Sequence, residues 1–182
     1  MDYLLIVIML IPAGLLMMLI LFGYVLTGQI SFFFNQQRIG KNGKVFTLWK
    51  FRTLSTDTNK TLQQRKFFWG TILRASNLDE LPQLWNVLRG EMSWVGPRPL
   101  PVDYATLFSA EQNKRHEVLP GITGLAQVSG KNNLSWNEKF KCDVEYVNRC
   151  SLWLDLTILF KTFLWALSFK QDTSLNEEKF TG

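Results

Sequence analysis

Two adjacent carboxylates and an arginine set between two prolines are the residues of this sequence best suited to chemistry. Asp79 and Glu80 stand side by side, and Arg98 lies between Pro97 and Pro99 in the same stretch, NLDELPQLWNVLRGEMSWVGPRPLP. An ionised aspartate is a competent nucleophile toward phosphorus and also a ligand for Mg²⁺. An arginine on a backbone stiffened by two prolines suits two-pronged recognition of a phosphate. The stretch therefore indicates a site that handles phosphate.

The two carboxylates also have a purely structural interpretation. Ser76 can cap a helix with Asp79 three residues further on, as in a capping box, or the helix can start at Pro82. In either case both carboxylates lie near a helix N-terminus, whose dipole favours negative charge, so we expect both to ionise readily. Taken alone, the pair is better explained by capping than by catalysis.

Further cations near the pair shift this balance toward catalysis. Lys50 and Arg52 lie two positions apart in KFRT, so they share a face if this segment is a strand. Arg74 precedes the carboxylates, and Lys131 lies in a glycine-rich loop. Each of these cations alone is an ordinary solvated charge. Together with the carboxylates and Arg98 they predict a site that binds a diphosphate and its metal ion.

The composition favours one domain with an anionic partner. The chain has 182 residues, of which 47% are hydrophobic and 19% charged, and its net charge is +5. This balance favours phospholipid, nucleotide or nucleic acid, and nucleic acid is excluded because no basic run occurs and a membrane segment is present. Cys142, Cys150 and His116 match neither a zinc pattern nor a histidine-dependent triad. Both cysteines are therefore expected to be free thiols in a reducing cytoplasm.

The first part of the chain predicts a membrane helix. Tyr3 to Leu26 carries no charge and forms a helix of about 36 Å, which is enough to cross a hydrocarbon core of about 30 Å. Pro12 in its middle predicts a kink, and a kinked helix either spans the bilayer or turns back with both ends on one side. Taken alone, the residues slightly favour spanning. The basic residues that follow, from Arg38 to Arg52, place the main domain in the cytoplasm.

Hydrophobic patterning and turn signals predict a mixed fold with mostly helices. The elements expected after the membrane segment are a hairpin across the turn 41–44, a polar loop at 55–66, an irregular glycine-punctuated segment at 120–133, and helices at 102–117, 135–148 and 151–169. The last helix is amphipathic and carries Trp153 and Trp165. It lies in the membrane interface, or it packs on the core or on a second subunit, and these interpretations stay open.

Four sequence blocks occur in one order along the chain: KFRTL, LDELPQLWNVLRGEMSWVGPRPL, LPGITGLAQVSGKN and FKCDVEYV. Together they resemble the bacterial sugar transferase family, the monotopic phosphoglycosyl transferases, over roughly residues 3–170. The resemblance implies an α/β, mostly helical fold with a re-entrant membrane helix at 1–28, a compact cytosolic catalytic domain at 29–170 and a polar tail at 171–182. The catalytic domain is expected to carry a short β-hairpin and interfacial amphipathic helices. Pro12 matches the proline that breaks the family's membrane helix, so both ends of that helix stay cytoplasmic.

The resemblance also implies an activity. A sugar 1-phosphate passes from a UDP-sugar to a polyprenyl (undecaprenyl) phosphate, UMP is released, and a glycoconjugate pathway begins. The enzyme works with Mg²⁺ at the cytoplasmic face of the bacterial inner membrane, in contact with phospholipid. A homodimer and downstream glycosyltransferases are its further expected partners.

The family mechanism implies roles for individual residues. The aspartate that matches Asp79 attacks the β-phosphate and forms a covalent phosphosugar enzyme, while Glu80 assists with Mg²⁺ or with activation of the acceptor. Arg98 matches the family's phosphate-holding arginine, and Lys50 matches the basic residue of the KFRT block. Asp143 matches an acidic family position to which no firm role is assigned.

Three positions depart from the family pattern. Ile11 stands where the family often has Ser before the helix-breaking proline. Only Met1 and Asp2 precede the helix, whereas a basic start is common, so the start is truncated or unusual. Lys131 stands where many relatives carry Arg, which keeps the charge but loses the two-pronged geometry.

The sequence leaves the donor sugar and two other functions open. Small members of the family often take N-acetylated sugars such as diacetylated bacillosamine, and we expect a donor of this kind. The first alternative function is a non-catalytic membrane scaffold of the same fold. The second is a magnesium-dependent phosphohydrolase that passes the phosphosugar to water.

Overall fold

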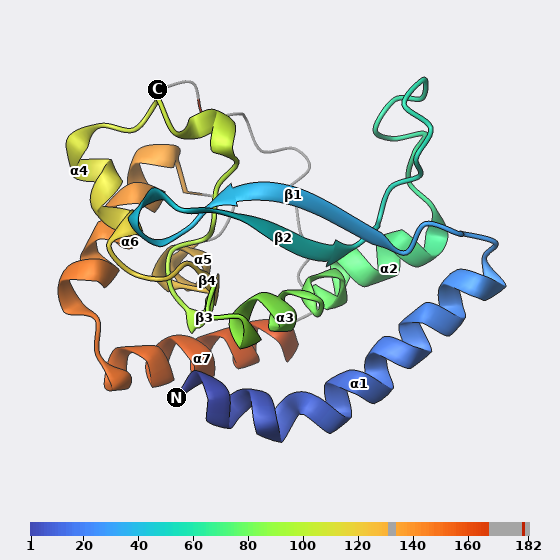
Figure 1. The fold of residues 1–182 in the computed structure, drawn as a ribbon, viewed down its shortest axis with the longest axis horizontal. Helices are drawn as coiled ribbons and strands as arrows, with labels where there is room; N and C mark the ends of the chain where they lie inside the picture. The colour runs from blue at the N-terminus through green and yellow to red at the C-terminus, as the bar shows by residue number, and fades with distance from the viewer. Residues whose placement is uncertain (131–133, 168–179, 181–182) are drawn as a thin grey trace.

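The computed structural model describes residues 1–130, 134–167 and 180, and it has the mixed, mostly helical architecture that the sequence predicts (Figure 1). Its helices are α1 (Asp2–Leu26), α2 (Phe68–Ala75), α3 (Gln83–Leu88), α4 (Ala110–Asn113), α5 (Leu125–Ser129), α6 (Trp136–Arg149) and α7 (Leu152–Leu167). Its strands are β1 (Phe33–Ile39), β2 (Val45–Phe51), β3 (Ser93–Val95) and β4 (Gly121–Thr123). In Figure 1 the β1–β2 hairpin crosses the upper half of the molecule, and α1 runs along the lower edge.

The predicted hairpin is confirmed. β1 and β2 pair antiparallel, from Phe33 opposite Phe51 to Ile39 opposite Val45. A short 3₁₀ turn connects them, and Asn42 in this turn has a φ of 55°, a conformation that asparagine tolerates better than most residues. Because β2 runs into the KFRT segment, the hairpin fixes where the cations of that segment lie.

The second sheet shows that the prediction of irregular structure at 120–133 was wrong. β3 and β4 pair in parallel, and α5 follows β4 after a single residue. The glycines that suggested turns instead allow close backbone contact, since a Cβ atom at Gly121 would lie 2.1 Å from the backbone nitrogen of Gly96. Residues 131–133 of the predicted segment lie outside the described residues.

The single helix predicted at 102–117 is also wrong. The segment forms α4 and two 3₁₀ turns, Val102–Tyr104 and Lys114–His116. Ser109 starts α4 with a capping box: its hydroxyl accepts from the Gln112 N–H at 3.2 Å, and the Gln112 side chain accepts from the Ser109 N–H at 2.9 Å. A capping residue has an extended backbone, so no helix can pass through Ser109.

The helices predicted at 135–148 and 151–169 are confirmed as α6 and α7 over the described residues. α6 begins with a second capping box, between Ser135 and Glu138. Residues 168–169 lie outside the described part of the chain, as does the predicted polar tail except for Phe180. Phe180 is buried, and its ring contacts those of Tyr104, Phe108, Trp136 and Phe140.

The membrane segment forms α1, a continuous helix of 25 residues with Pro12 inside it. Its ribbon changes direction along its length (Figure 1), as expected for a helix in which proline removes one backbone hydrogen bond. The part from Leu4 to Leu26 is long and apolar enough to cross a membrane. Most large side chains of this part are exposed, so only one face of α1 packs on the protein.

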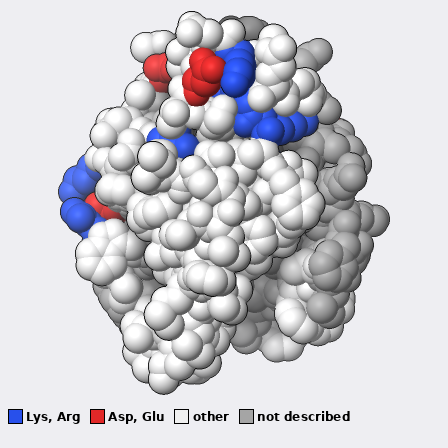
Figure 2. Space-filling view, turned by 90° about the vertical axis from the view of Figure 1, so that its right-hand side faces the viewer, with Lys and Arg blue, Asp and Glu red and all other residues white. Residues whose placement is uncertain are grey.

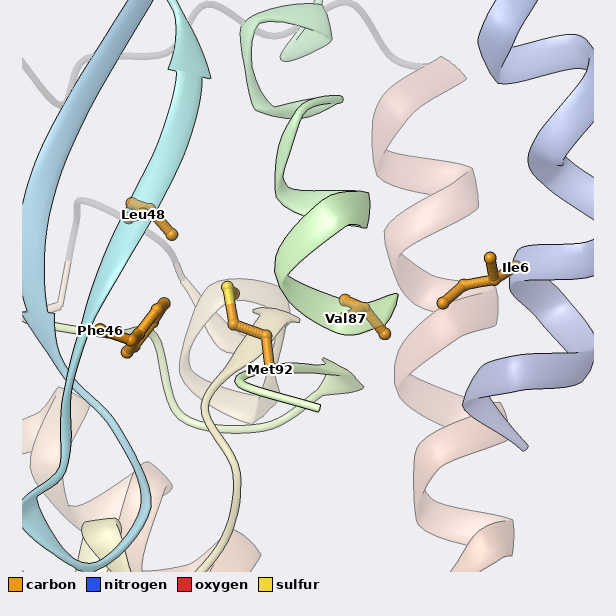
Figure 3. Packing of buried hydrophobic residues seen from close by; sticks show 5 residues of the cluster. All are labelled: Ile6, Phe46, Leu48, Val87 and Met92. Carbon is orange, nitrogen blue, oxygen red and sulfur yellow. The ribbon is translucent and has the colours of Figure 1, made fainter. Parts of the chain in front are cut away.

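The N-terminal end of α1 is attached to the rest of the protein. Ile6 lies in a buried cluster with Phe46 and Leu48 of β2, Val87 of α3 and Met92 (Figure 3). The indole N–H of Trp94, on β3, also donates to the carbonyl of Asp2 at 3.2 Å.

The C-terminal end of α1 is attached to the same body. Ile20 and Tyr24 form a second buried cluster with Phe51 of β2 and Leu73 of α2. The indole N–H of Trp69, on α2, donates to the carbonyl of Ile20 at 3.2 Å. The Tyr24 hydroxyl donates to the carbonyl of Arg52. α1 therefore lies along the body and contacts it near both of its ends.

A large part of the surface is apolar. Figure 2 shows a broad face without charged side chains, with Lys, Arg, Asp and Glu confined to its upper and left margins. The exposed large apolar side chains belong chiefly to α1 and α7, and Trp153 at the start of α7 is 79% exposed. Surfaces of this kind on a water-soluble protein mark contact with a membrane or another protein.

Candidate active site

A cavity of about 650 Å³ lies between the hairpin, the turn before α3, the loop 96–101 and the helices α5 to α7. Its described walls carry more positive than negative side chains. The cationic side chains are Arg38, Lys50, Arg52, Arg65, Arg74, Arg98, Arg115 and Lys139, and the acidic ones are Asp79, Glu80 and Asp143. A concave surface with this excess of positive charge attracts anionic ligands.

The cavity brings together seven of the residues that the sequence singled out. These are Lys50, Arg52, Arg74, Asp79, Glu80, Arg98 and Asp143. Lys131 lies outside the described residues. The cavity also contains four cations that were not predicted to belong to the site: Arg38, Arg65, Arg115 and Lys139. Their sequence positions carry no signal for it, because only the fold brings them to the cavity.

The carboxylate pair lies on a 3₁₀ turn between two helices. α2 ends at Ala75, and Asn77 follows with a left-handed φ of 56°, which redirects the chain into the turn Leu78–Glu80. The interpretation of Ser76 as an N-cap is wrong, because Ser76 ends α2 and its hydroxyl donates back to the Ile72 carbonyl at 2.9 Å. α3 then begins directly after Pro82, close to the other predicted start.

Glu80 holds two cations at one carboxylate oxygen. Its Oε1 accepts from Lys50 Nζ at 2.5 Å and from Arg98 Nη2 at 2.8 Å. Burial alone would raise the pKa of Glu80, but the charges of Arg98 and Lys50 outweigh burial and hold its pKa well below its ordinary value. Glu80 is therefore ionised and keeps Lys50 and Arg98 together beside Asp79.

Asp79 lies in a different environment from its neighbour. Its side chain is 6% exposed, and Lys50 and Arg98, which pair with Glu80, act on it through their charges. Burial raises its pKa to about 6, and the charge of Lys50 partly opposes this rise. The expectation that both carboxylates ionise readily is therefore wrong for Asp79. Above pH 6 Asp79 presents an ionised carboxylate beside these cations, which is the state a nucleophile requires.

Two arginines, the buried Arg115 and the half-buried Arg38, hold the backbone of the Arg98 loop. Arg115 Nη2 donates to the carbonyl of Arg98 at 2.7 Å, and Arg38 Nη1 donates to the carbonyl of Pro99 at 3.1 Å. Burial, followed by the charge of Arg98, lowers the pKa of Arg38 to about 10. Its guanidinium therefore remains charged at neutral pH.

Asp143 is linked to the site through Arg115. It forms an ion pair with Arg115, with 2.8 Å between Oδ2 and Nη2, and both side chains are almost completely buried. Because Arg115 in turn binds the carbonyl of Arg98, the contacts of Asp143 place it in the support of the arginine loop.

The two remaining predicted cations are fixed by neighbouring groups of the cavity wall. Arg74 donates to the Thr53 hydroxyl through Nε at 3.2 Å and Nη2 at 2.8 Å. Arg52 donates to the carbonyl of Phe33 at 3.0 Å, and its guanidinium lies 5.9 Å from the centre of the Phe34 ring. The cavity therefore presents cations in defined positions around Asp79.

The carboxylate pair fits Mg²⁺ only as part of a shared site. Among the described residues, no group of three or more His, Cys, Asp or Glu side chains is placed to hold a metal. Mg²⁺ is commonly bound by one or two carboxylates, with water and substrate phosphates completing its shell. The oxygens of Asp79 and Glu80 suit this arrangement, in which the metal arrives with a diphosphate.

Comparison with known proteins identifies the family of this chain. The profile of the family described as "Bacterial sugar transferase" matches residues 1–169. The chain is 47% identical over 158 residues to the "Uncharacterized sugar transferase EpsL" of Bacillus subtilis (strain 168), which covers 82% of this chain and 78% of that protein. The chain belongs to the bacterial sugar transferase family.

Two similar proteins have names that state an activity. The "UDP-glucose:undecaprenyl-phosphate glucose-1-phosphate transferase" of Xanthomonas campestris pv. campestris is 38% identical over 185 residues, covering 93% of this chain and 38% of that protein. The "Undecaprenyl-phosphate galactose phosphotransferase" of Salmonella typhimurium (strain LT2) is 35% identical over 151 residues, covering 71% of this chain and 32% of that protein. The chain spans less than two fifths of the length of both.

Proposed function

We propose that this protein transfers a sugar 1-phosphate from a UDP-sugar to a polyprenyl phosphate such as undecaprenyl phosphate and releases UMP. The similar proteins from Xanthomonas and Salmonella support both substrate classes through their names. The observation that carries the proposal is the environment of Asp79, a buried carboxylate beside Lys50 and Arg98, inside a cavity whose charged side chains are mainly cationic. Such a site can hold an anionic donor and attack it.

In the first step an oxygen of ionised Asp79 attacks the β-phosphorus of the UDP-sugar. The bond from that phosphorus to the bridging oxygen breaks, UMP leaves, and an aspartyl phosphosugar remains. In the second step an oxygen of the polyprenyl phosphate attacks the same phosphorus, the sugar phosphate passes to the lipid, and Asp79 is released as a carboxylate. The covalent intermediate lets two anionic substrates react in turn, so they need not meet.

The cations offset the negative charge of both steps. Lys50 and Arg98 stand beside Asp79 because Glu80 binds both of them. Arg74 contributes a third positive charge that the pKa of Asp79 senses. Asp79 and Glu80 would hold Mg²⁺ together with the diphosphate, and the metal would supply further neutralisation of negative charge. Lys50, Arg74 and Arg98 are in place before the reaction, so little reorganisation is needed when charge develops.

The enzyme is proposed to act at the cytoplasmic face of the bacterial inner membrane, with α1 re-entering the membrane from that side. A helix that crosses a bilayer leaves its two ends on opposite sides, but here the body contacts both Ile6 and Tyr24. This arrangement favours a helix that dips into one leaflet. It also reverses the slight preference for spanning that the residues alone gave.

The test is UMP release from a panel of UDP-sugars in nanodiscs that contain undecaprenyl phosphate and Mg²⁺. The panel includes UDP-glucose, UDP-galactose and N-acetylated donors, with Asp79→Asn as the inactive control. UMP release that depends on the lipid supports the transferase. Release of free sugar phosphate without the lipid identifies a phosphohydrolase. If the folded protein releases no UMP with any donor of the panel, this result contradicts the transferase and favours the scaffold.

A further inference from the structure

The side-chain amide of Gln127, on α5, is buried without a hydrogen-bond partner. Both its Nε2 and its Oε1 are inaccessible and unbonded. A primary amide offers two donors and an acceptor, and leaving all of them unused in the interior lowers stability. Most buried polar groups in folded proteins are hydrogen-bonded, so an exception of this kind needs an explanation.

The position of Gln127 points to a ligand as that explanation. Gln127 is one of the residues that line the cavity containing Asp79. The hydroxyls of Thr123 and Thr162 line the same cavity and form a hydrogen bond with each other at 2.7 Å. Neither hydroxyl bonds to the amide of Gln127. Gly124 leaves room for the amide oxygen, since a Cβ atom there would lie 2.8 Å from Gln127 Oε1.

The surroundings of Gln127 favour a neutral ligand group. Its neighbours on α5 in the cavity wall are Ala126 and Val128, and α7 adds Thr162 and Ala166. The charged groups of the cavity come from other segments: the hairpin and the loop after it, α2, the turn before α3, the loop 96–101, the turn that contains Arg115, and α6. The cavity thus joins a cationic region suited to phosphates to a wall that is largely uncharged.

We propose that the side chain of Gln127 turns from its inaccessible position into the cavity and recognises the UDP-sugar donor by hydrogen bonds to a neutral amide- or imide-type group, with Nε2 donating and Oε1 accepting. This inference rests on the proposed function. Two parts of such a donor carry a carbonyl next to an N–H: the uracil ring and an acylamino substituent of the sugar. The amide of Gln127 complements either group, whereas a phosphate offers it no donor.

The test compares Gln127→Met with the parent protein in the same nanodiscs. Methionine keeps the length of the side chain and removes both hydrogen-bonding ends. Gln127→Asn retains an amide on a shorter stem, and Gln63→Met, in the exposed loop 55–66, is the matched control. For each protein we would measure the KM for the best donor of the panel, inhibition by UMP, and the melting temperature without ligand.

The expected result separates recognition from folding. The KM of Gln127→Met should rise about tenfold, as for the loss of a hydrogen bond to substrate, while its melting temperature stays the same or rises because an unsatisfied amide has been removed. Gln63→Met should match the parent in every measurement. A parallel tenfold loss of UMP inhibition assigns the contact to uracil, and unchanged UMP inhibition with a lower preference for N-acylated donors assigns it to the sugar.

Two outcomes would overturn the inference. Unchanged donor KM and UMP inhibition in Gln127→Met would mean that water fills the site. A fall in melting temperature with unchanged kinetics would mean that Gln127 only supports the fold. Both are read against an active parent enzyme, so they are distinct from failure of the proposed function, in which the parent itself releases no UMP.

Discussion

At the scale of single residues, the site depends on the contrast between two neighbours. Asp79 and Glu80 adjoin in the sequence, yet burial raises the pKa of Asp79 to about 6, while Arg98 and Lys50 lower that of Glu80 despite its burial. Carboxylates whose pKa values are pushed apart take different roles in catalysis. In the proposed mechanism Asp79 attacks, while Glu80 holds Lys50 and Arg98 in place.

Asp79→Asn should abolish transfer and stabilise the protein. Between pH 3.8 and about 6 the folded state keeps a proton on Asp79 that the unfolded chain has released, so stability falls as pH rises through this window. Above pH 6 the raised pKa of Asp79 lowers the free energy of unfolding by up to about 3 kcal/mol, and Asp79→Asn should recover this loss. UMP release and denaturant unfolding at pH 7.5 measure the two effects. Near-normal turnover would exclude Asp79 as the nucleophile, and a less stable variant would contradict the raised pKa.

The pH dependence of the first step gives a separate prediction. In the proposed mechanism only ionised Asp79 attacks, so single-turnover release of UMP should increase about tenfold per pH unit below about 6 and level off above it. Rapid-quench measurements at constant Mg²⁺ test this, with circular dichroism to show that the enzyme stays folded. A flat profile from pH 5 to 8 in folded enzyme would contradict it.

Asp143→Asn should destabilise the protein by about 3–5 kcal/mol, because it leaves the buried charge of Arg115 unpaired. The folded fraction should also bind the donor more weakly, since Arg115 supports the carbonyl of Arg98. Unfolding curves and the donor KM measure both effects. The matched control is Glu145→Gln on the same helix, because Glu145 forms an exposed ion pair with Arg149. This variant should lower the free energy of unfolding by less than about 1 kcal/mol. Equal losses in the two variants would show that the burial of Asp143 has no special effect.

At the scale of elements, local signals predicted some parts of the fold and long-range contacts decided the others. The turn around Asn42 and the cap at Ser135 lie within a few residues of the elements they define, so the hairpin and α6 were predictable. The parallel pairing of β3 with β4 joins segments far apart in the chain, and the glycines of the segment 120–133, Gly121 among them, looked like turn residues. The break of the predicted helix at Ser109 could have been predicted, because Ser109 and Gln112 have the spacing of a capping box.

The same division applies to the site. The carboxylates and Arg98 were found because they crowd into one stretch with distinctive neighbours. Arg38 and Arg115 reach the loop of Arg98 from distant segments, and no spacing in the sequence links them to it. The raised pKa of Asp79 was not predicted, because the sequence indicates the nearby helix start but not the burial of the side chain. Burial has the largest effect on this pKa.

The turn that carries the carboxylates gives a prediction at this scale. Asn77 has a φ of 56°, so Asn77→Ala should cost about 1 kcal/mol and reduce transfer by shifting the turn, while Asn77→Gly should keep both properties. Asn42→Ala is the control, because Asn42 has a φ of 55° in the hairpin turn and lies outside the cavity wall. It should show the same loss of stability with unchanged UMP release. If Asn77→Ala transfers normally, the geometry of the turn does not limit the reaction.

At the scale of the whole molecule, the attachment of α1 at both ends sets the relation of the body to the membrane. Clusters around Ile6 and around Tyr24 hold the helix against β2, α2 and α3, and its exposed face remains apolar. A membrane helix held in this way cannot project straight away from the catalytic body. The fold thus favours a protein that lies on one leaflet.

Cysteine labelling tests this topology. In a background with Cys142 and Cys150 replaced by serine, Asp2→Cys and Ser31→Cys mark the two ends of α1. In inside-out membrane vesicles a membrane-impermeant maleimide should label both positions, because both ends face the cytoplasm in the proposed topology. Labelling of the two positions from opposite sides would show a spanning helix.

The cavity takes part of its wall from the two apolar helices, with Met9 of α1 and Trp165 of α7 lining the same space as Asp79. For a transferase whose acceptor is dissolved in the bilayer, the acceptor is then encountered by diffusion in two dimensions. The concentration that governs the second half-reaction is its mole fraction among the surrounding lipids, while the nucleotide sugar is sampled from the bulk solution. Dilution with inert phospholipid slows such an enzyme even when the total amounts of protein, donor and acceptor in the tube stay constant.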